Sequence, residues 1–422
     1  MKTKKYFIFS LMILASCISG CSPEKEPLPD AYVEGSDHQY MYMGGFDFYP
    51  NFQKGEQGYY FRYNNFIYFF DAKEETIVPL CSKADCLHDK ERDQEKLESC
   101  NAYAGTNYDT GLAYCNGYLY YIDPDFTQTN PTLYRFAADG SKKEKLYEWD
   151  DGSIAIQQWI VHRDVLYYMV QSFSTGEEDV GQFNAVYALP LTGRSRLKPI
   201  QIYTPEDGIE VFTLGNPTAY GNYMYFTLMG NLEGWDGSDE TWQEYDYTKT
   251  FVYDIRAEEL RELRIPGQSN TTAVTGVEFW QDRLILTPFD SSKSYLEDRD
   301  CYLSDLDGSN SELLMTSKQG YSLFGDENYL YVSNVGLVQV GYDNSPKLYH
   351  IYDNELNEID TFTTASNFTY DFPIGDCDRA YVIYYKENGE WGLEYWDKSE
   401  IGTLDGAEIE FTMIPYEGSV QK

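Results

Sequence analysis

The chain has 422 residues, a formal net charge of −37, and 41 tyrosines beside 23 phenylalanines. Nucleic acid is excluded as a partner by this acidity, because phosphate recognition needs clustered Lys and Arg. The length is more than one ordinary hydrophobic core serves, so we expect two domains or a repeat architecture.

An export signal is predicted over residues 1–20. Three lysines precede an apolar run over 6–18, which is short for a membrane span and has the build of a cleaved signal. Ser19 and Gly20 then lead directly to Cys21, whose thiol is placed to accept a lipid anchor. A plain signal with an incidental cysteine is the alternative. Residues 21–37 are rich in proline and mixed charge, which predicts a lipidated N-terminus and a flexible stalk before a folded domain over 38–422.

A short aromatic segment after a polar turn recurs seven times along the folded part. It occupies residues 65–69, 117–121, 164–168, 222–226, 283–286, 328–332 and 380–385. A second hairpin follows most copies, and Asp139-Gly140 and Asp307-Gly308 carry the Asp-Gly pair that favours a tight turn between two strands. Each repeat therefore predicts four strands.

Four-stranded units of this kind expose apolar faces that radial stacking into a closed ring would bury. We therefore predict an all-β fold with a single β-propeller of seven four-stranded blades. Six blades is the alternative if the first or last unit is irregular, and a tandem of β-sandwiches is a further alternative.

The most chemically suggestive group is formed by Cys81, Cys86, His88 and Cys100. Three thiols and an imidazole could complete a tetrahedral zinc site. Disulfides are favoured on the oxidising side of a membrane, and Cys115 offers a further partner. Our preferred hypothesis pairs Cys86 with Cys100 and Cys81 with Cys115, without a cofactor; zinc is the alternative.

The residues 78–89 around the first two of these cysteines, followed by Cys100-Asn101-Ala102-Tyr103, resemble uncharacterised propeller lipoproteins of gut Firmicutes. The wider repeat is similar to TolB-like and low-density-lipoprotein-receptor-like propellers. The resemblance covers most of the chain after the signal, but only the cysteine segment is specific. It implies a fold and a location at a Gram-positive cell surface, and it implies no activity.

Long loops are expected between the second and third strands of the blades, where they share one face with the connectors between blades. They cover residues 123–131, 172–184, 229–250, 290–300 and 334–345. Loops on a rigid scaffold commonly carry binding sites. The richest loop contains the candidate ligand contacts Trp235, Asp236, Trp242, Tyr245 and Tyr247, whose rings could stack on sugars or hold a cation. Alternatively, these aromatic side chains pin an acidic surface loop to the neighbouring blade.

The usual catalytic signatures are missing from the sequence: G-x-S-x-G, H-E-x-x-H, a Walker motif and a dinucleotide fingerprint. No catalytic residue is assigned, and enzymatic activity is left open, with the balance against it. We expect a monomeric, membrane-anchored extracytoplasmic protein that binds a glycan, a peptide or an envelope protein. A surface glycoside hydrolase or lyase with carboxylates in the propeller channel is the alternative.

Overall fold

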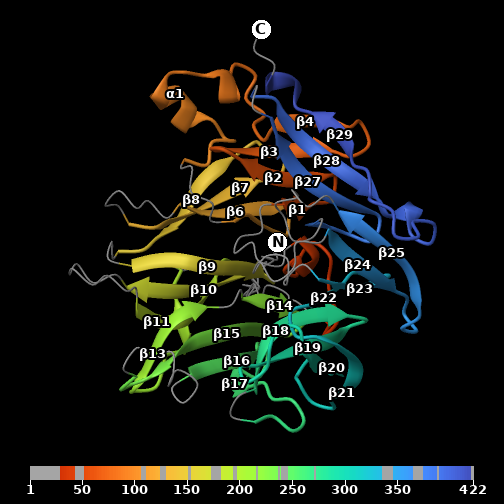
Figure 1. The fold of residues 1–422 in the computed structure, drawn as a ribbon. Helices are drawn as coiled ribbons and strands as arrows, with labels where there is room; N and C mark the ends of the chain where they lie inside the picture. The colour runs from red at the N-terminus through yellow and green to blue at the C-terminus, as the bar shows by residue number, and fades with distance from the viewer. Residues whose placement is uncertain are drawn as a thin grey trace, which may run out of the picture.

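The computed structural model describes residues 29–42, 52–105, 111–123, 130–150, 154–172, 182–192, 197–214, 217–235, 238, 246–269, 272–334, 346–364, 374–386 and 389–419. Seven antiparallel sheets are arranged around a common centre (Figure 1). Each sheet uses strands that are consecutive in the chain, so each is one blade. The predicted seven-bladed β-propeller is confirmed.

The strands of the first three blades follow one another along the chain. Blade 1 contains β1 (Phe52–Lys54), β2 (Tyr59–Tyr63), β3 (Phe66–Asp71) and β4 (Thr76–Pro79); blade 2 contains β5 (Ala113–Cys115), β6 (Tyr118–Asp123), β7 (Thr132–Ala137) and β8 (Lys143–Glu148); blade 3 contains β9 (Ile154–His162), β10 (Val165–Ser172), β11 (Gln182–Pro190) and β12 (Ile200–Tyr203).

The first strand of blade 4 is split into two pieces that both pair with its second strand. Blade 4 contains β13 (Ile209–Leu214), β14 (Thr218–Tyr220), β15 (Tyr223–Leu232), β16 (Asp246–Asp254) and β17 (Glu259–Glu262); blade 5 contains β18 (Thr272–Trp280), β19 (Arg283–Asp290), β20 (Asp298–Ser304) and β21 (Glu312–Lys318).

The last two blades complete the ring. Blade 6 contains β22 (Ser322–Gly325), β23 (Leu330–Ser333), β24 (Lys347–Tyr352) and β25 (Glu358–Thr364); blade 7 contains β26 (Ile374–Gly375), β27 (Arg379–Tyr385), β28 (Trp391–Asp397) and β29 (Thr412–Pro415). First strands of adjoining blades contact one another, as β1 does with β5 and β5 with β9, so they form the inner ring.

The recurrent aromatic segment is the second strand in blades 2 to 7, whereas in blade 1 it is the third strand, β3. The reason is that the true second strand of blade 1, β2, has an equally aromatic sequence and pairs with β3 through a tight turn, Tyr63 opposite Phe66. Two adjacent strands of one blade therefore satisfy the same pattern.

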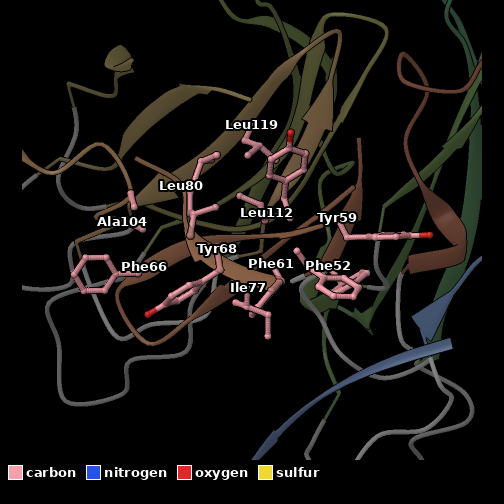
Figure 2. Close-up of a cluster of buried hydrophobic side chains, with 14 of the residues drawn as sticks. Phe52, Tyr59, Phe61, Phe66, Tyr68, Ile77, Leu80, Ala104, Leu112 and Leu119 are labelled. Atoms are coloured by element: carbon pink, nitrogen blue, oxygen red, sulfur yellow. The ribbon is translucent and has the colours of Figure 1, made fainter. Parts of the chain in front are cut away.

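The core lies between blades, where the faces of neighbouring sheets meet. Figure 2 shows part of it, with Phe61 and Tyr68 of blade 1 near Leu119 of blade 2. The ring closes by aromatic packing between blade 7 and blade 1. The ring centroids of Tyr63 and Trp391 are 4.3 Å apart.

The turn between the third and fourth strands of a blade packs against the preceding blade. Tyr60 Oη of blade 1 donates to Ala138 O of blade 2 at 3.0 Å, and Tyr225 Oη of blade 4 donates to Leu306 O of blade 5 at 2.5 Å. Neighbouring blades are thus joined by hydrogen bonds as well as by apolar packing.

Helical structure is sparse. Among the described residues the α-helical part is α1 (Gln94–Ser99), with short 3₁₀ turns η1 (Tyr40–Tyr42), η2 (His88–Lys90), η3 (Lys398–Glu400) and η4 (Glu417–Ser419). None of these helices has the length and apolar character that a membrane crossing requires.

Candidate functional site

The predicted cysteine and histidine group is assembled in the connector between blades 1 and 2. Cys81 follows the end of β4 closely, His88 begins η2, and Cys100 caps the C-terminus of α1. The potential ligand atoms of Cys81, Cys86, His88 and Cys100 all lie within 4.8 Å of one another. Cys100 Sγ is 3.7 Å from His88 Nδ1. The structure thus brings together the four residues that the sequence analysis grouped.

The environment of the cluster perturbs its titrating groups in different directions. Burial raises the pKa of Cys100 to about 12. Burial also acts upward on Cys81, but the backbone N–H groups of Lys83 and Asn101 and the neighbouring thiols outweigh it, so the pKa of Cys81 lies below its usual value. Burial lowers the pKa of His88, which favours the neutral imidazole.

Cys115 does not belong to this cluster. It is fully buried in β5, where its Sγ donates to Ser36 O at 3.3 Å and accepts from Asp164 N at 3.4 Å. The hypothesis that Cys81 pairs with Cys115 is therefore not supported, because the two thiols belong to different surroundings. The six described cysteines are all unbonded, and Cys86 and Cys100 remain close enough to be alternative partners.

The predicted ligand-contact loop follows β15. Trp235 is half-buried, and its Nε1 donates to Ser238 O at 3.2 Å. Tyr247 is buried in β16, and its hydroxyl is 3.4 Å from the hydroxyl of Tyr203 in β12 of the preceding blade. Tyr247 thus pins the base of the loop to its neighbour. Asp236, Trp242 and Tyr245 lie outside the described residues.

The sequence analysis did not predict that the N-terminal segment packs on the ring. Residues 29–42, which we call the N-terminal strap, pack on the ring, whereas residues up to 37 were expected to be a flexible stalk. Asn116 N donates to Gly35 O at 2.7 Å, and Arg163 N donates to Ser36 O at 2.8 Å. These partners lie in the turns between the first and second strands of blades 2 and 3.

A buried ion pair fastens the middle of the strap. Arg163 Nε donates to Asp37 Oδ1 at 2.7 Å, and both side chains are almost fully buried. Gly221 N in blade 4 also donates to this carboxylate, at 3.2 Å. Burial still raises the pKa of Asp37, although Arg163 and the backbone donors oppose it.

His162, which precedes Arg163 in the chain, is held neutral by two backbone groups. His38 N donates to His162 Nδ1 at 3.0 Å, and His162 Nε2 lies 2.8 Å from Gly221 O, to which it donates. Burial lowers the pKa of His162, and also that of His38, to about 3. The strap therefore selects one tautomer of His162.

The far end of the strap reaches the blades at the ring closure. The Tyr40 ring packs 4.9 Å from Phe279 of blade 5, between ring centroids. Tyr42 Oη donates to Asp376 Oδ2 of blade 7 at 3.1 Å, and Tyr59 Oη of blade 1 donates to the same oxygen at 2.9 Å. The strap thus contacts blades 1, 2, 3, 4, 5 and 7, through Lys54, Asn116, Arg163, Gly221, Phe279 and Asp376.

One inner-ring carboxyl group stands out electrostatically. Glu278 in β18 is half-buried, and burial raises its pKa to about 8.

No family model matches the chain, and no curated protein sequence matches it. Solved structures that resemble it include an oligogalacturonate lyase in complex with manganese, at a TM-score of 0.44 and 11% identity over 84% of each chain. A dipeptidyl peptidase 4 of Porphyromonas gingivalis has a TM-score of 0.43 and 10% identity over 91% of this chain and 53% of its own. A nidogen/laminin complex has a TM-score of 0.37 and 10% identity over 72% and 92%. These similarities concern the fold.

Proposed function

We propose that the protein is a lipid-anchored extracytoplasmic binding protein, which presents the loops between the second and third strands of its blades to a ligand. The proposal combines the export signal and Cys21 with the position of the strap. The resemblance of the cysteine segment to Firmicutes lipoproteins favours the outer side of a Gram-positive membrane.

The strap supports the proposal because, with a lipid on Cys21, it limits which face could lie near the membrane. Eight residue steps separate Cys21 from Pro29, so the tether spans at most about 29 Å. Arg163 Nη2 donates to Pro29 O at 2.8 Å, beside the turn between β9 and β10. A domain of this length has a radius of gyration of about 21 Å, so the tether is too short to pass around it. The face bearing these turns would therefore lie toward the membrane.

Antiparallel strands place the loops between second and third strands at the opposite ends, and thus on the face that would point outward. Three large apolar side chains are solvent-exposed there: Leu232 at the end of β15, Leu296 between β19 and β20, and Tyr385 at the end of β27, exposed by 41%, 53% and 72%. Loops on a rigid scaffold commonly carry binding sites, which supports a binding role for this face. The ligand classes we propose remain a glycan, a peptide or an envelope protein.

A binding screen tests this face. The purified full-length protein in detergent would be applied to a glycan array, a peptide library and membrane-protein extracts. For the ligand so identified, we expect Trp235→Ala with Trp242→Ala, and separately Leu296→Ala with Tyr385→Ala, to weaken binding roughly tenfold or more, as the loss of central aromatic anchors does. Leu313→Ala is the matched control, because Leu313 is 58% exposed but lies on the outer strand β21.

The outcomes separate the alternatives. Binding that survives both double variants and is lost on substituting residues of the turn-bearing face would overturn the proposed orientation. Release of reducing sugars or unsaturated products from a glycan that binds would replace the binding role by the hydrolase or lyase alternative.

A further inference from the structure

We propose that Cys81, Cys86, His88 and Cys100 bind one structural Zn²⁺ ion, which fastens the connector between blades 1 and 2. The geometry is the first argument. Tetrahedral zinc, with bonds of about 2.3 Å to sulfur and 2.0–2.1 Å to nitrogen, holds its ligand atoms about 3.5–3.8 Å apart. The four ligand atoms lie within 4.8 Å of one another, and Cys100 Sγ is already 3.7 Å from His88 Nδ1.

The number of thiols is the second argument. One disulfide would consume two of the three and leave a thiol and an imidazole beside it. Cys115 cannot complete a second bridge, because its sulfur is engaged with Ser36 and Asp164 in another part of the core. A metal ion uses all four side chains, and it protects three clustered thiols from oxidation outside the cytoplasm.

The connector itself supplies the third argument. No side chain from Ser82 to Ser99 is fully buried; Cys86 and Leu97 pack in part against the core of blade 1. Helix α1 has six residues, too few for a helix to be stable alone. Apolar burial therefore contributes little to holding the path of this segment. Metal ligation would supply stability, because its binding free energy becomes folding free energy.

The backbone is adapted to the four side chains. His88 has a φ of +54°, in the left-handed region that side chains rarely adopt. The half-buried Lys143, whose Nζ donates to Tyr103 O at 2.7 Å, supplies positive charge near Cys100. A centre with three thiolates, neutral imidazole and Zn²⁺ carries one negative charge, which this ammonium group complements.

The contacts around the cluster indicate a structural role. Ser82 N and Asn101 Nδ2 both donate to Gly140 O in the turn between β7 and β8, at 3.1 and 2.8 Å. Tyr68 Oη donates to Asp89 Oδ2 at 3.2 Å. All four metal positions are filled by protein, so no position is open for water or substrate. The ion would join the connector to both blades.

Metal analysis and intact mass on the same sample test the proposal. The full-length protein, purified without chelator, is expected to contain about one zinc ion per chain, and its unreduced polypeptide should have the mass of free thiols. Cobalt replacing zinc should give the visible absorption of a tetrahedral thiolate site. His88→Ala should lower the zinc content to about one tenth or less, and His88→Cys should restore it, because a thiolate replaces the imidazole. Cys377→Ser, at a half-buried cysteine elsewhere, should keep the metal.

A measurement on the unaltered sequence covers the case in which a variant fails to fold. Removal of zinc with a strong chelator should make residues 82–99 sensitive to protease while the β-sheet signal in circular dichroism persists, and added zinc should reverse this. A metal-free chain that is two hydrogen masses lighter and yields a Cys86–Cys100 cross-linked peptide would show that these residues form a disulfide and not a zinc site. Metal-free, reduced protein that takes up no zinc would also overturn the proposal. Neither result bears on the proposed ligand face.

Discussion

At the scale of single residues, one buried histidine of this propeller is paired on both sides with backbone groups. In His162, both ring nitrogens are engaged and the ring is fully buried. The arrangement suits only the neutral ring. If Nδ1 were protonated, its N–H would face the N–H of His38, and Nδ1 could no longer accept that hydrogen bond.

Stability should therefore fall in acid. The pKa of His162 is about 3 in the folded protein, against about 6.5 when unfolded, so the unfolded chain binds more protons between these values. Stability is fully present above pH 6.5 and is lost as the pH falls toward 3. We expect His162→Gln to reduce the loss of unfolding free energy between pH 7.5 and 4 by on the order of 3 kcal/mol, measured by urea titration. An unchanged loss would mean that the imidazole is solvated.

Gly140 is a second single position at which the structure requires a particular residue, here glycine. Its φ is +70°, and a β-carbon there would lie 2.9 Å from the backbone nitrogen of Cys81. Both facts favour glycine, because the turn comes too close to blade 1 for a side chain.

Gly140→Ala should therefore destabilise the protein by about 2–3 kcal/mol, as strain and a backbone contact add together. Gly117→Ala is the control. Gly117 has a φ of +80°, but a β-carbon there would meet nothing within 4 Å, so it should show the conformational cost alone. Equal losses in thermal unfolding of the two variants would show that the turn can move away from Cys81.

At the scale of elements, the seam between blade 7 and blade 1 closes the ring. In the described part of the chain the two blades exchange no strand, so side chains must hold the seam. Trp391 is central to it. Its ring packs 4.3 Å from Tyr63, 4.7 Å from Tyr68 and 4.5 Å from Tyr416, between centroids.

Trp391→Ala should cost about 3–5 kcal/mol of unfolding free energy, the usual range for a large aromatic side chain lost from a core. Hydrogen exchange should show the greatest loss of protection in β2, β3 and β28, which meet at the seam. Trp235→Ala removes a half-buried loop indole and is expected to change stability by less than about 1 kcal/mol. A loss of protection spread evenly over all seven blades would contradict the seam as the weak point.

At the scale of the whole molecule, location is the property that most needs testing. Cys21→Ser should move the protein from the membrane fraction to the soluble fraction, because one thiol would carry the lipid that holds it. Cys17→Ser is the matched control, since Cys17 lies within the predicted signal. Fractionation and labelling with a fatty-acid analogue measure both. Membrane retention of the Cys21 variant would exclude acylation at that residue as the anchor.

The seven blades could be predicted because their signals are local: alternating aromatic residues and Asp-Gly turns lie within a few residues of one another. The Cys81–Cys100 cluster was also within reach, because a short segment contains it. The docking of the strap could not be predicted, because Asp37 and Arg163 are 126 positions apart and no local pattern indicates that they pair. The ring of Tyr32 was a signal, since a solvated stalk has little use for an aromatic side chain.

The seat of the strap has a consequence for the order of folding. The strap is synthesised before every blade, yet it docks on residues that are made at very different times, from Asn116 to Asp376 near the other end of the chain. Its complete seat exists only after blade 7 has been made. The strap must therefore be among the last segments to settle, and its docking marks a finished ring.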